Sequence, residues 1–241
     1  MEIARYCLRF LALMVTGLLF SCIDGREEVW LAADGSGRAD VCYSIPLAAA
    51  KFQGGEEGIR RMIGEFLGRS PAIESSAFEV IADQDRLKVR VRLTFKSALE
   101  LAKITTGSSA DKLPAAASHL VGEVKVDFHG LNVEFSRTLS PGSALPGAFF
   151  MPASQFEGRN LTYIIHLPDA ATESNATRTE DAGRTLVWDF TLAEAIQRPI
   201  TTHFKAPVSI PRWLLFTAPA GLSLALLAFL GWWRARRAQR P

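Results

Sequence analysis

The feature that most constrains this chain is an uncharged run of 21 residues near its C-terminal end, WLLFTAPAGLSLALLAFLGWW. As a helix it would be about 31 Å long, the thickness of the hydrocarbon core of a bilayer. Trp213, Trp232 and Trp233 stand at its two ends, where indole rings favour the membrane interface. Residues 211–233 are therefore predicted to form a transmembrane helix. The alternative is a helix buried in a soluble core.

A basic tail follows this run. Residues 234–241 read RARRAQRP and contain four arginines, among them Arg234, Arg236 and Arg237. An excess of arginine on one side of a span places that side in the cytoplasm. The tail is therefore predicted to be cytoplasmic, and the chain before the span to be extracytoplasmic.

The N-terminal end has the pattern of an export signal. Two arginines in MEIARYCLR precede eleven uncharged residues, FLALMVTGLLF, which are too few to span a bilayer, since a helix needs about 20. Leu19, Ser21 and Cys22 resemble the bacterial lipobox. Residues 1–21 are predicted to be a lipoprotein signal peptide, and Cys22 to carry diacylglycerol and acyl chains such as palmitate. The alternative is cleavage by ordinary signal peptidase beside an incidental cysteine.

Together the two ends predict a protein of the bacterial plasma membrane, with residues 22–210 as one extracytoplasmic domain. Only Cys42 remains for that domain once the signal has been removed and Cys22 has been lipidated, so no disulfide can form within the chain. Cys42 lies in a run of alternating residues and is expected to be a small buried side chain.

Charge and motifs limit the function of the domain. The formal net charge is +2, but Arg5, Arg9 and the arginines of the tail lie outside the domain, which is therefore mildly acidic. No nucleic-acid partner is expected. The four histidines are scattered, and the motifs of common hydrolases, phosphate-binding loops and zinc sites do not occur. We expect no cofactor, no metal site and no enzymatic activity, although a catalytic site assembled in space stays open.

Periodicity predicts the elements of the domain. The stretch DGSG at residues 34–37 is typical of a hairpin turn, and GEEGIRRMIGEFLGRSP has the apolar spacing of a helix. RLKVRVRLTF alternates as a strand with one wet face, and Ser97 with Glu100 forms a capping box before a short helix. Several strand-like runs follow residue 122. The fold class expected is α+β, with an antiparallel curved sheet and helices packed on one of its faces.

A long apolar loop interrupts these strands. It reads SPGSALPGAFFMPASQFEGRN and contains Phe149, Phe150, Met151 and Phe156. Loops of this length are usually functional or mobile. This one would dip into the membrane, form a lid over a ligand pocket, or pack on the sheet.

The layout resembles LppM-type mycobacterial lipoproteins. The matching features are LLFSC, the early strand before DGSG, and TLVWDFTLAEAIQRPITTHFKAP, which leads into the membrane span and contains Trp188. The resemblance implies a helix-grip-like domain with an apolar or glycolipid ligand. Two hypotheses follow. One is a membrane-tethered module that binds a lipid, glycolipid or other amphiphile; the other is an envelope scaffold that binds a partner protein and no small ligand.

Overall fold

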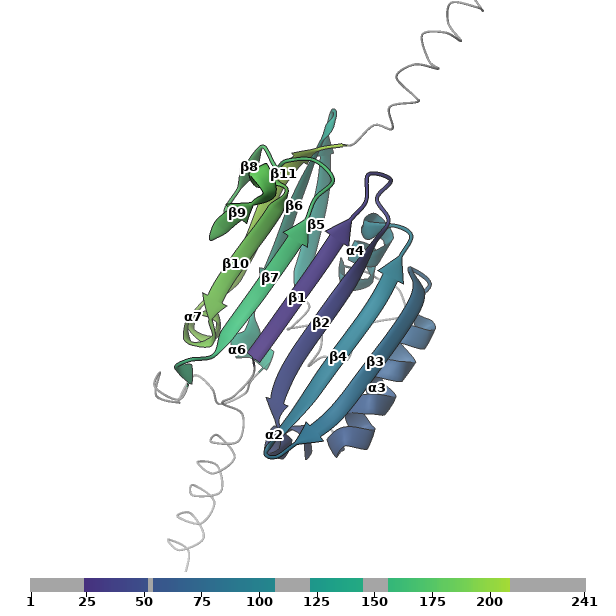
Figure 1. Ribbon diagram of the computed structural model, residues 1–241, viewed down its shortest axis with the longest axis vertical. Coiled ribbons are helices and arrows are strands. Elements are labelled where there is room, and N and C mark those ends of the chain that lie inside the picture. Colours follow the sequence, from purple (N-terminus) through teal and green to yellow (C-terminus); the bar gives the residue numbers. More distant parts are fainter. Residues whose placement is uncertain (1–23, 52–53, 107–121, 145–155, 209–241) are drawn as a thin grey trace, which may run out of the picture.

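The computed structural model of the protein describes residues 24–51, 54–106, 122–144 and 156–208. Within these ranges the chain forms two β-sheets and several short helices (Figure 1). No helix in these ranges is long and apolar enough to cross a membrane. The span predicted for residues 211–233 lies outside the described residues.

The larger sheet, called here the large sheet, has seven strands in the order β3-β4-β2-β1-β7-β10-β9. It is open, because β3 and β9 form two separate edges. Its strands are β1 (Asp24–Leu31), β2 (Gly37–Pro46), β3 (Ile73–Asp83), β4 (Arg86–Phe95), β7 (Asn160–His166), β9 (Arg178–Glu180) and β10 (Thr185–Thr191).

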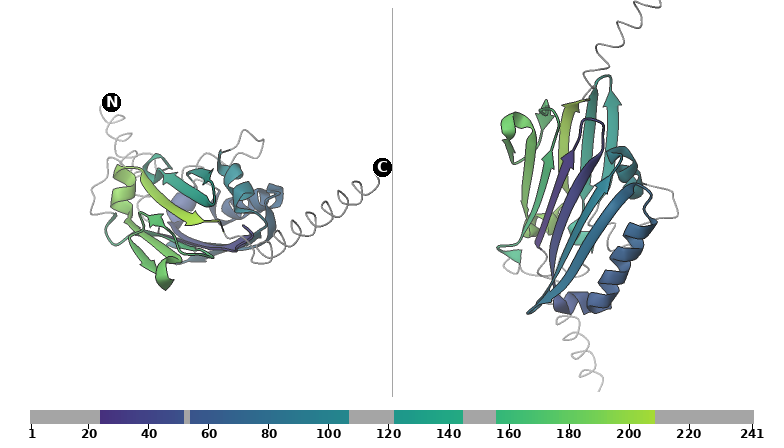
Figure 2. Two further views of the ribbon diagram at one scale, coloured as in Figure 1. Left: turned by 90° about the horizontal axis from the view of Figure 1, so that it is seen from above. Right: turned by 45° about the vertical axis from the view of Figure 1, so that its right-hand side comes forward.

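The small sheet has four strands in the order β5-β6-β11-β8. These are β5 (Glu123–His129), β6 (Asn132–Leu139), β11 (Ile200–Pro207) and β8 (Glu173–Ser174). Figure 2 shows the small sheet facing the half of the large sheet that contains β7 and β10.

The α+β class is confirmed, but the expected single antiparallel sheet is replaced by two sheets. One pair in the large sheet is also parallel, since β1 runs alongside β7 with Gly25 opposite Leu161 and Trp30 opposite His166. Alternation along a strand predicts which side chains share a face. It carries no information about which distant strand is the neighbour.

The face of the large sheet that is turned toward the small sheet is called here the inner face, and the opposite one the outer face. Helices cover the half of the inner face that the small sheet does not cover. α3 (Gly55–Arg69) packs on β3, and α2 (Leu47–Lys51) precedes it, while α4 (Ala98–Thr106) lies beside β5 (Figure 2). The remaining helices are α6 (Pro141–Ala144), the 3-10 turn η3 (Asp181–Gly183) and α7 (Leu192–Gln197). The predicted helix stripe is confirmed in α3, where Ile59 and Leu67 are buried.

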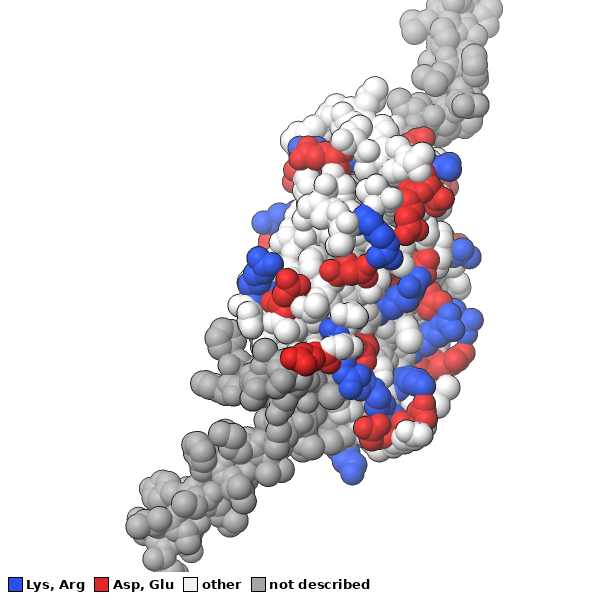
Figure 3. Space-filling view, turned by 60° about the vertical axis from the view of Figure 1, so that its left-hand side comes forward, with Lys and Arg blue, Asp and Glu red and all other residues white. Residues whose placement is uncertain are grey.

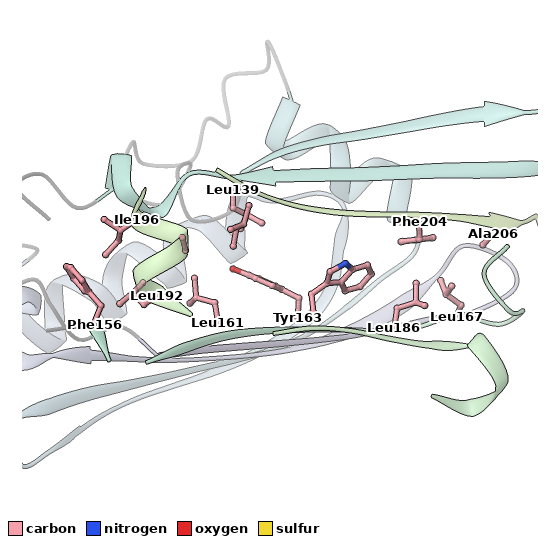
Figure 4. Packing of buried hydrophobic residues seen from close by; sticks show 13 residues of the cluster. Leu139, Phe156, Leu161, Tyr163, Leu167, Leu186, Leu192, Ile196, Phe204 and Ala206 are labelled. Carbon is pink, nitrogen blue, oxygen red and sulfur yellow. The ribbon is translucent and has the colours of Figure 1, made fainter. Parts of the chain in front are cut away.

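Because the small sheet covers one half of the inner face and the helices cover the other half, the domain has two hydrophobic cores. The first, called here the main core, lies between the two sheets and contains Trp188. Tyr163, Leu186 and Phe204, labelled in Figure 4, belong to the same core. The second lies under α3 and α2 and contains Ile59, Val80, Leu87 and Val89 together with Ala50.

The local turns agree with the sequence. Gly35 has φ 82° in the β1–β2 turn, and the Asp34 carboxylate accepts hydrogen bonds from the backbone and the hydroxyl of Ser36. The capping box predicted at Ser97 is confirmed in part, since its hydroxyl accepts from the backbone N–H of Glu100 at 3.3 Å.

The two ends of the described domain point in opposite directions. β1 begins at Asp24, which accepts a hydrogen bond from the backbone of Asn160. Thr191, the last residue of β10, pairs with Asn160 and so lies at the same end of the domain as Asp24. The chain continues from there through α7 into β11, so β11 begins at this end and runs away from it to Val208. In Figure 1 the start of β1 is low in the view and the tip of β11 is high.

Candidate functional site

The side chains on the inner face of the large sheet are mostly apolar, and one carboxylate lies among them. A row of residues paired across six strands runs from β3 to β10: Phe78, Val91, Val41, Glu27, Tyr163 and Trp188. Glu27 is the charged member of this row. A carboxylate at such a position needs partners, because burial without them is costly.

Those partners come from both sheets. Arg137 of β6 donates two hydrogen bonds to the Glu27 carboxylate, at 2.6 Å and 3.2 Å, and the Tyr43 hydroxyl donates to one of the same oxygens. The Arg137 guanidinium also lies 5.1 Å from the centre of the Tyr163 ring. The side chains of Arg137 and Glu27 are only 14% and 13% exposed. The four residues, called here the inter-sheet cluster, join the two sheets by a paired buried charge.

The cluster fixes the protonation state of its members. Burial and the neighbouring Glu27 carboxylate raise the pKa of Tyr43 well above its ordinary value, and the pKa of Tyr163 is raised for the same two reasons. Burial alone would lower the pKa of Arg137, but the charge of Glu27 outweighs it and raises that pKa. Both phenols therefore stay neutral while the guanidinium stays charged.

This arrangement predicts a loss of stability in alkali. The two tyrosines lose their protons near pH 10 in the unfolded chain but keep them at that pH in the folded one. Their contribution to the free energy of unfolding is therefore complete below about pH 10 and is lost as the pH rises above it. We expect the free energy of unfolding to fall by up to about 1.4 kcal/mol per pH unit for each tyrosine in that range.

Urea denaturation at pH 8 and at higher pH measures this slope. The double variant Y43F/Y163F should have a clearly shallower alkaline decline, whatever its stability at pH 8. An equally steep decline in the double variant would assign the alkaline loss to other groups.

Next to the cluster lie apolar side chains that belong to neither core. Val29, Val41 and Leu93 project from the inner face of β1, β2 and β4 and are half-buried. Among the residues that the structure describes, they pack in neither of the two buried clusters. Val29 and Leu93 flank Ala39 in one row of the sheet. We call these three residues the inner stripe. It can offer an apolar surface beside a paired charge.

The outer face of the large sheet carries a different polar group. The Nε2 atom of His166 lies 2.8 Å from a carboxylate oxygen of Glu28, and its Nδ1 atom lies 3.0 Å from the hydroxyl oxygen of Thr185. This order of carboxylate, histidine and hydroxyl resembles a hydrolytic triad. Thr185 is only 3% exposed, however, and its hydroxyl donates to Asp181 at 2.7 Å. A nucleophile must be reachable and have its proton available to a base, so this geometry favours a structural role.

Trp30 lies beside His166 on the outer face of the large sheet, and neighbouring side chains cover its ring. Arg38 of β2 lies 4.3 Å from the centre of the Trp30 ring, and the His166 ring of β7 stacks on Trp30 with centres 5.0 Å apart. Since β1 lies between β2 and β7, both faces of the indole are covered. Trp30 therefore offers no free ring on which a sugar would stack.

Charges of both signs alternate over the surface in Figure 3. Many are paired across strands, as Arg90 is with Asp40 and Arg178 with Asp189. Within the described ranges, no three His, Cys, Asp or Glu side chains come together as possible metal ligands.

The structure describes few of the residues singled out in the sequence. The predicted lipidation residue, the predicted membrane-interface residues and most of the apolar loop lie outside the described residues: Cys22, Trp213, Trp232, Trp233, Arg234, Arg236, Arg237, Phe149, Phe150 and Met151. Phe156 is described, and it is 3% exposed in the main core near Leu192 and Ile196 (Figure 4). For that residue the packed alternative holds.

The prediction for Cys42 is wrong. Its side chain is exposed and free, because Val41 and Tyr43 point inward and the residue between them must point outward. The inter-sheet cluster was missed. Its signal is present, since Glu27 and Arg137 are opposite charges at inward positions of two alternating strands.

These features define the class of the protein: a mixed α+β domain, mostly sheet, with an open large sheet and a buried ion pair between two layers. No family model matches the chain, and no curated protein matches it. Five chains of solved structures do match.

One of these is the folded domain of LppM from Mycobacterium tuberculosis, determined by NMR. It is 13% identical to this chain, with a TM-score of 0.50 over 79% of this chain and 92% of that one. The resemblance to LppM is therefore confirmed at the level of the fold.

Proposed function

We propose that this protein is an envelope lipoprotein whose extracytoplasmic domain binds the acyl part of a lipid or glycolipid. The inner stripe carries the proposal, because its half-buried valines and leucine lie on an inner face but outside both packed cores. Ligand sites are mostly apolar with a few fixed polar groups, which the inter-sheet cluster would supply. The likeness to LppM-type lipoproteins supports the envelope location. The role proposed is binding without catalysis.

The proposed anchors constrain how the domain meets the membrane. Cys22 is two residues from Asp24, about 7 Å at most, and Trp213 is five residues from Val208, about 17 Å at most. β11 alone extends over about 26 Å, and the anchors leave from opposite ends of the domain. With both anchors engaged in one bilayer, the domain lies lengthwise along the membrane surface.

Filling the inner stripe tests the binding proposal. We expect the whole protein, purified in detergent from its own envelope, to retain one lipid per chain by native mass spectrometry. The variant V41W should lose it, because the larger side chain occupies the apolar surface. C42W is the matched control, since the neighbouring Cys42 is exposed on the other face, and it should keep the lipid. A wild-type protein without lipid, or equal loss in both variants, would contradict the proposal.

A second candidate function is a protein scaffold, and the edge strand β3 favours it. This strand has eleven residues, forms an outer edge of the large sheet, and exposes 54% of Ile81. Unpaired edges can accept a strand from another chain. Photo-crosslinking from β3 in intact cells would recover a partner protein under this hypothesis, and only the monomer under the lipid-binding one.

A further inference from the structure

The tip of the β5–β6 hairpin presents large apolar side chains to solvent. His129 pairs with Asn132, so Gly130 and Leu131 form a two-residue loop in which Gly130 has φ 63°. Leu131 is 65% exposed and Phe128 is 57% exposed, the highest fractions among the large apolar side chains of the described chain. Polar residues and glycine are the usual occupants of such loops.

The end of the described chain reaches the same tip. Pro207 of β11 pairs with Asn132, and the backbone N–H of Val208 donates to the carbonyl of Leu131 at 2.7 Å. Val208 is itself 36% exposed. The three residues Phe128, Leu131 and Val208, called here the tip patch, therefore come from two distant parts of the sequence and meet at one corner of the domain.

Chain length fixes what lies close to this corner. Trp213, the first residue of the uncharged run, comes five residues after Val208, and a fully extended chain covers about 17 Å over five residues. We propose that the tip patch inserts into the interface of the bilayer beside the point where the chain enters it. The inference rests on the span proposed for residues 211–233 and does not need the lipid on Cys22 or a ligand on the inner stripe.

The charges on the hairpin agree with one orientation. Phe128 continues the inner-face alternation of Val124 and Val126, whereas Asp127 lies on the outer face opposite Glu134. That outer face is polar, because Lys125 is exposed there and Glu134 pairs with His203 and Lys205. The hairpin would therefore meet the membrane with its tip and its apolar inner edge, and with the polar outer face turned away.

Photo-crosslinking in native membranes tests the contact on the whole protein. Benzoylphenylalanine replaces Phe128 or Leu131, and mass spectrometry identifies the adducts after illumination. Lys125 is the matched control, because it lies on the same strand, faces outward and is 67% exposed. Leu222, within the proposed span, controls for membrane insertion. We expect lipid adducts at positions 128, 131 and 222 and none at 125.

The other outcomes separate the possible failures. An adduct at 222 without adducts at 128 and 131 would overturn the tip contact and leave the span intact. No adduct at 222 would overturn the span and this inference with it. A protein adduct at 128 would show that the tip binds a partner instead. The lipid adduct at 128 should persist in V41W; its loss there would assign it to a lipid on the inner stripe and overturn the bilayer contact.

Discussion

Replacing Arg137 by leucine is expected to lower the free energy of unfolding by about 3–5 kcal/mol, the usual cost of removing one partner from a buried ion pair. The variant leaves the Glu27 carboxylate between the sheets, where the Tyr43 hydroxyl of its own sheet still donates to it. The two hydrogen bonds that cross from the small sheet are lost with the guanidinium. Urea denaturation of the detergent-solubilised protein, followed by near-UV circular dichroism, measures the change.

Two controls separate this effect from a general loss of charge. The double variant E27L/R137L should be clearly more stable than R137L, because it removes the uncompensated carboxylate as well. R90L removes a surface pair with Asp40 on the outer face of the same sheet, where Arg90 is 50% exposed, and should cost at most about 1 kcal/mol. A double variant no better than R137L would mean that packing of the Arg137 stem, and not its charge, is what matters.

Replacing Trp188 by alanine is expected to cost about 3–5 kcal/mol. The side chain is fully buried in the core between the sheets. Its indole N–H donates to the side-chain oxygen of Asn175 at 2.7 Å, and the same oxygen accepts from the backbone of His203 in β11. The variant therefore opens a cavity and also breaks a link between the large sheet and the small one.

W30A is the matched control for this change. Trp30 lies on the outer face of β1, and its removal forfeits the contacts with Arg38 and His166 but opens no cavity between the sheets. We expect a loss of about 1–2 kcal/mol. W188F should fall between the two alanine variants, since it keeps most of the buried volume and loses the hydrogen bond. Equal losses for W30A and W188A would contradict the assignment of the main core.

Several parts of the fold follow from short-range patterns. The strand at Arg86–Phe95 has one wet face, the helix at Gly55–Arg69 buries its predicted stripe, and the turn at Gly35 has the positive φ that DGSG indicates. Each of these depends on neighbours within a few residues, where the period of side-chain directions is fixed by backbone geometry. The same rule, applied strictly to β2, would have placed Cys42 on the outer face.

The candidate site could not be predicted in the same way. Glu27 and Arg137 are 110 residues apart, and their pairing depends on β1 and β6 facing each other from two different sheets. An inward charge in each strand signals that a partner is needed, but not where it is. The tip patch is a similar case, because Val208 reaches Leu131 only through the pairing of β11 with β6.

The sequence by itself determined the positions of most strands and of the main helix, the apolar runs at both ends, and the alternation that gives each strand two different faces. The tertiary structure decided that there are two sheets, that β1 runs parallel to β7, and that the domain ends point in opposite directions. The physical reason is the range of the forces involved. Backbone periodicity is local, whereas strand partners are chosen by the burial of whole faces and the pairing of buried charges between residues far apart in the chain.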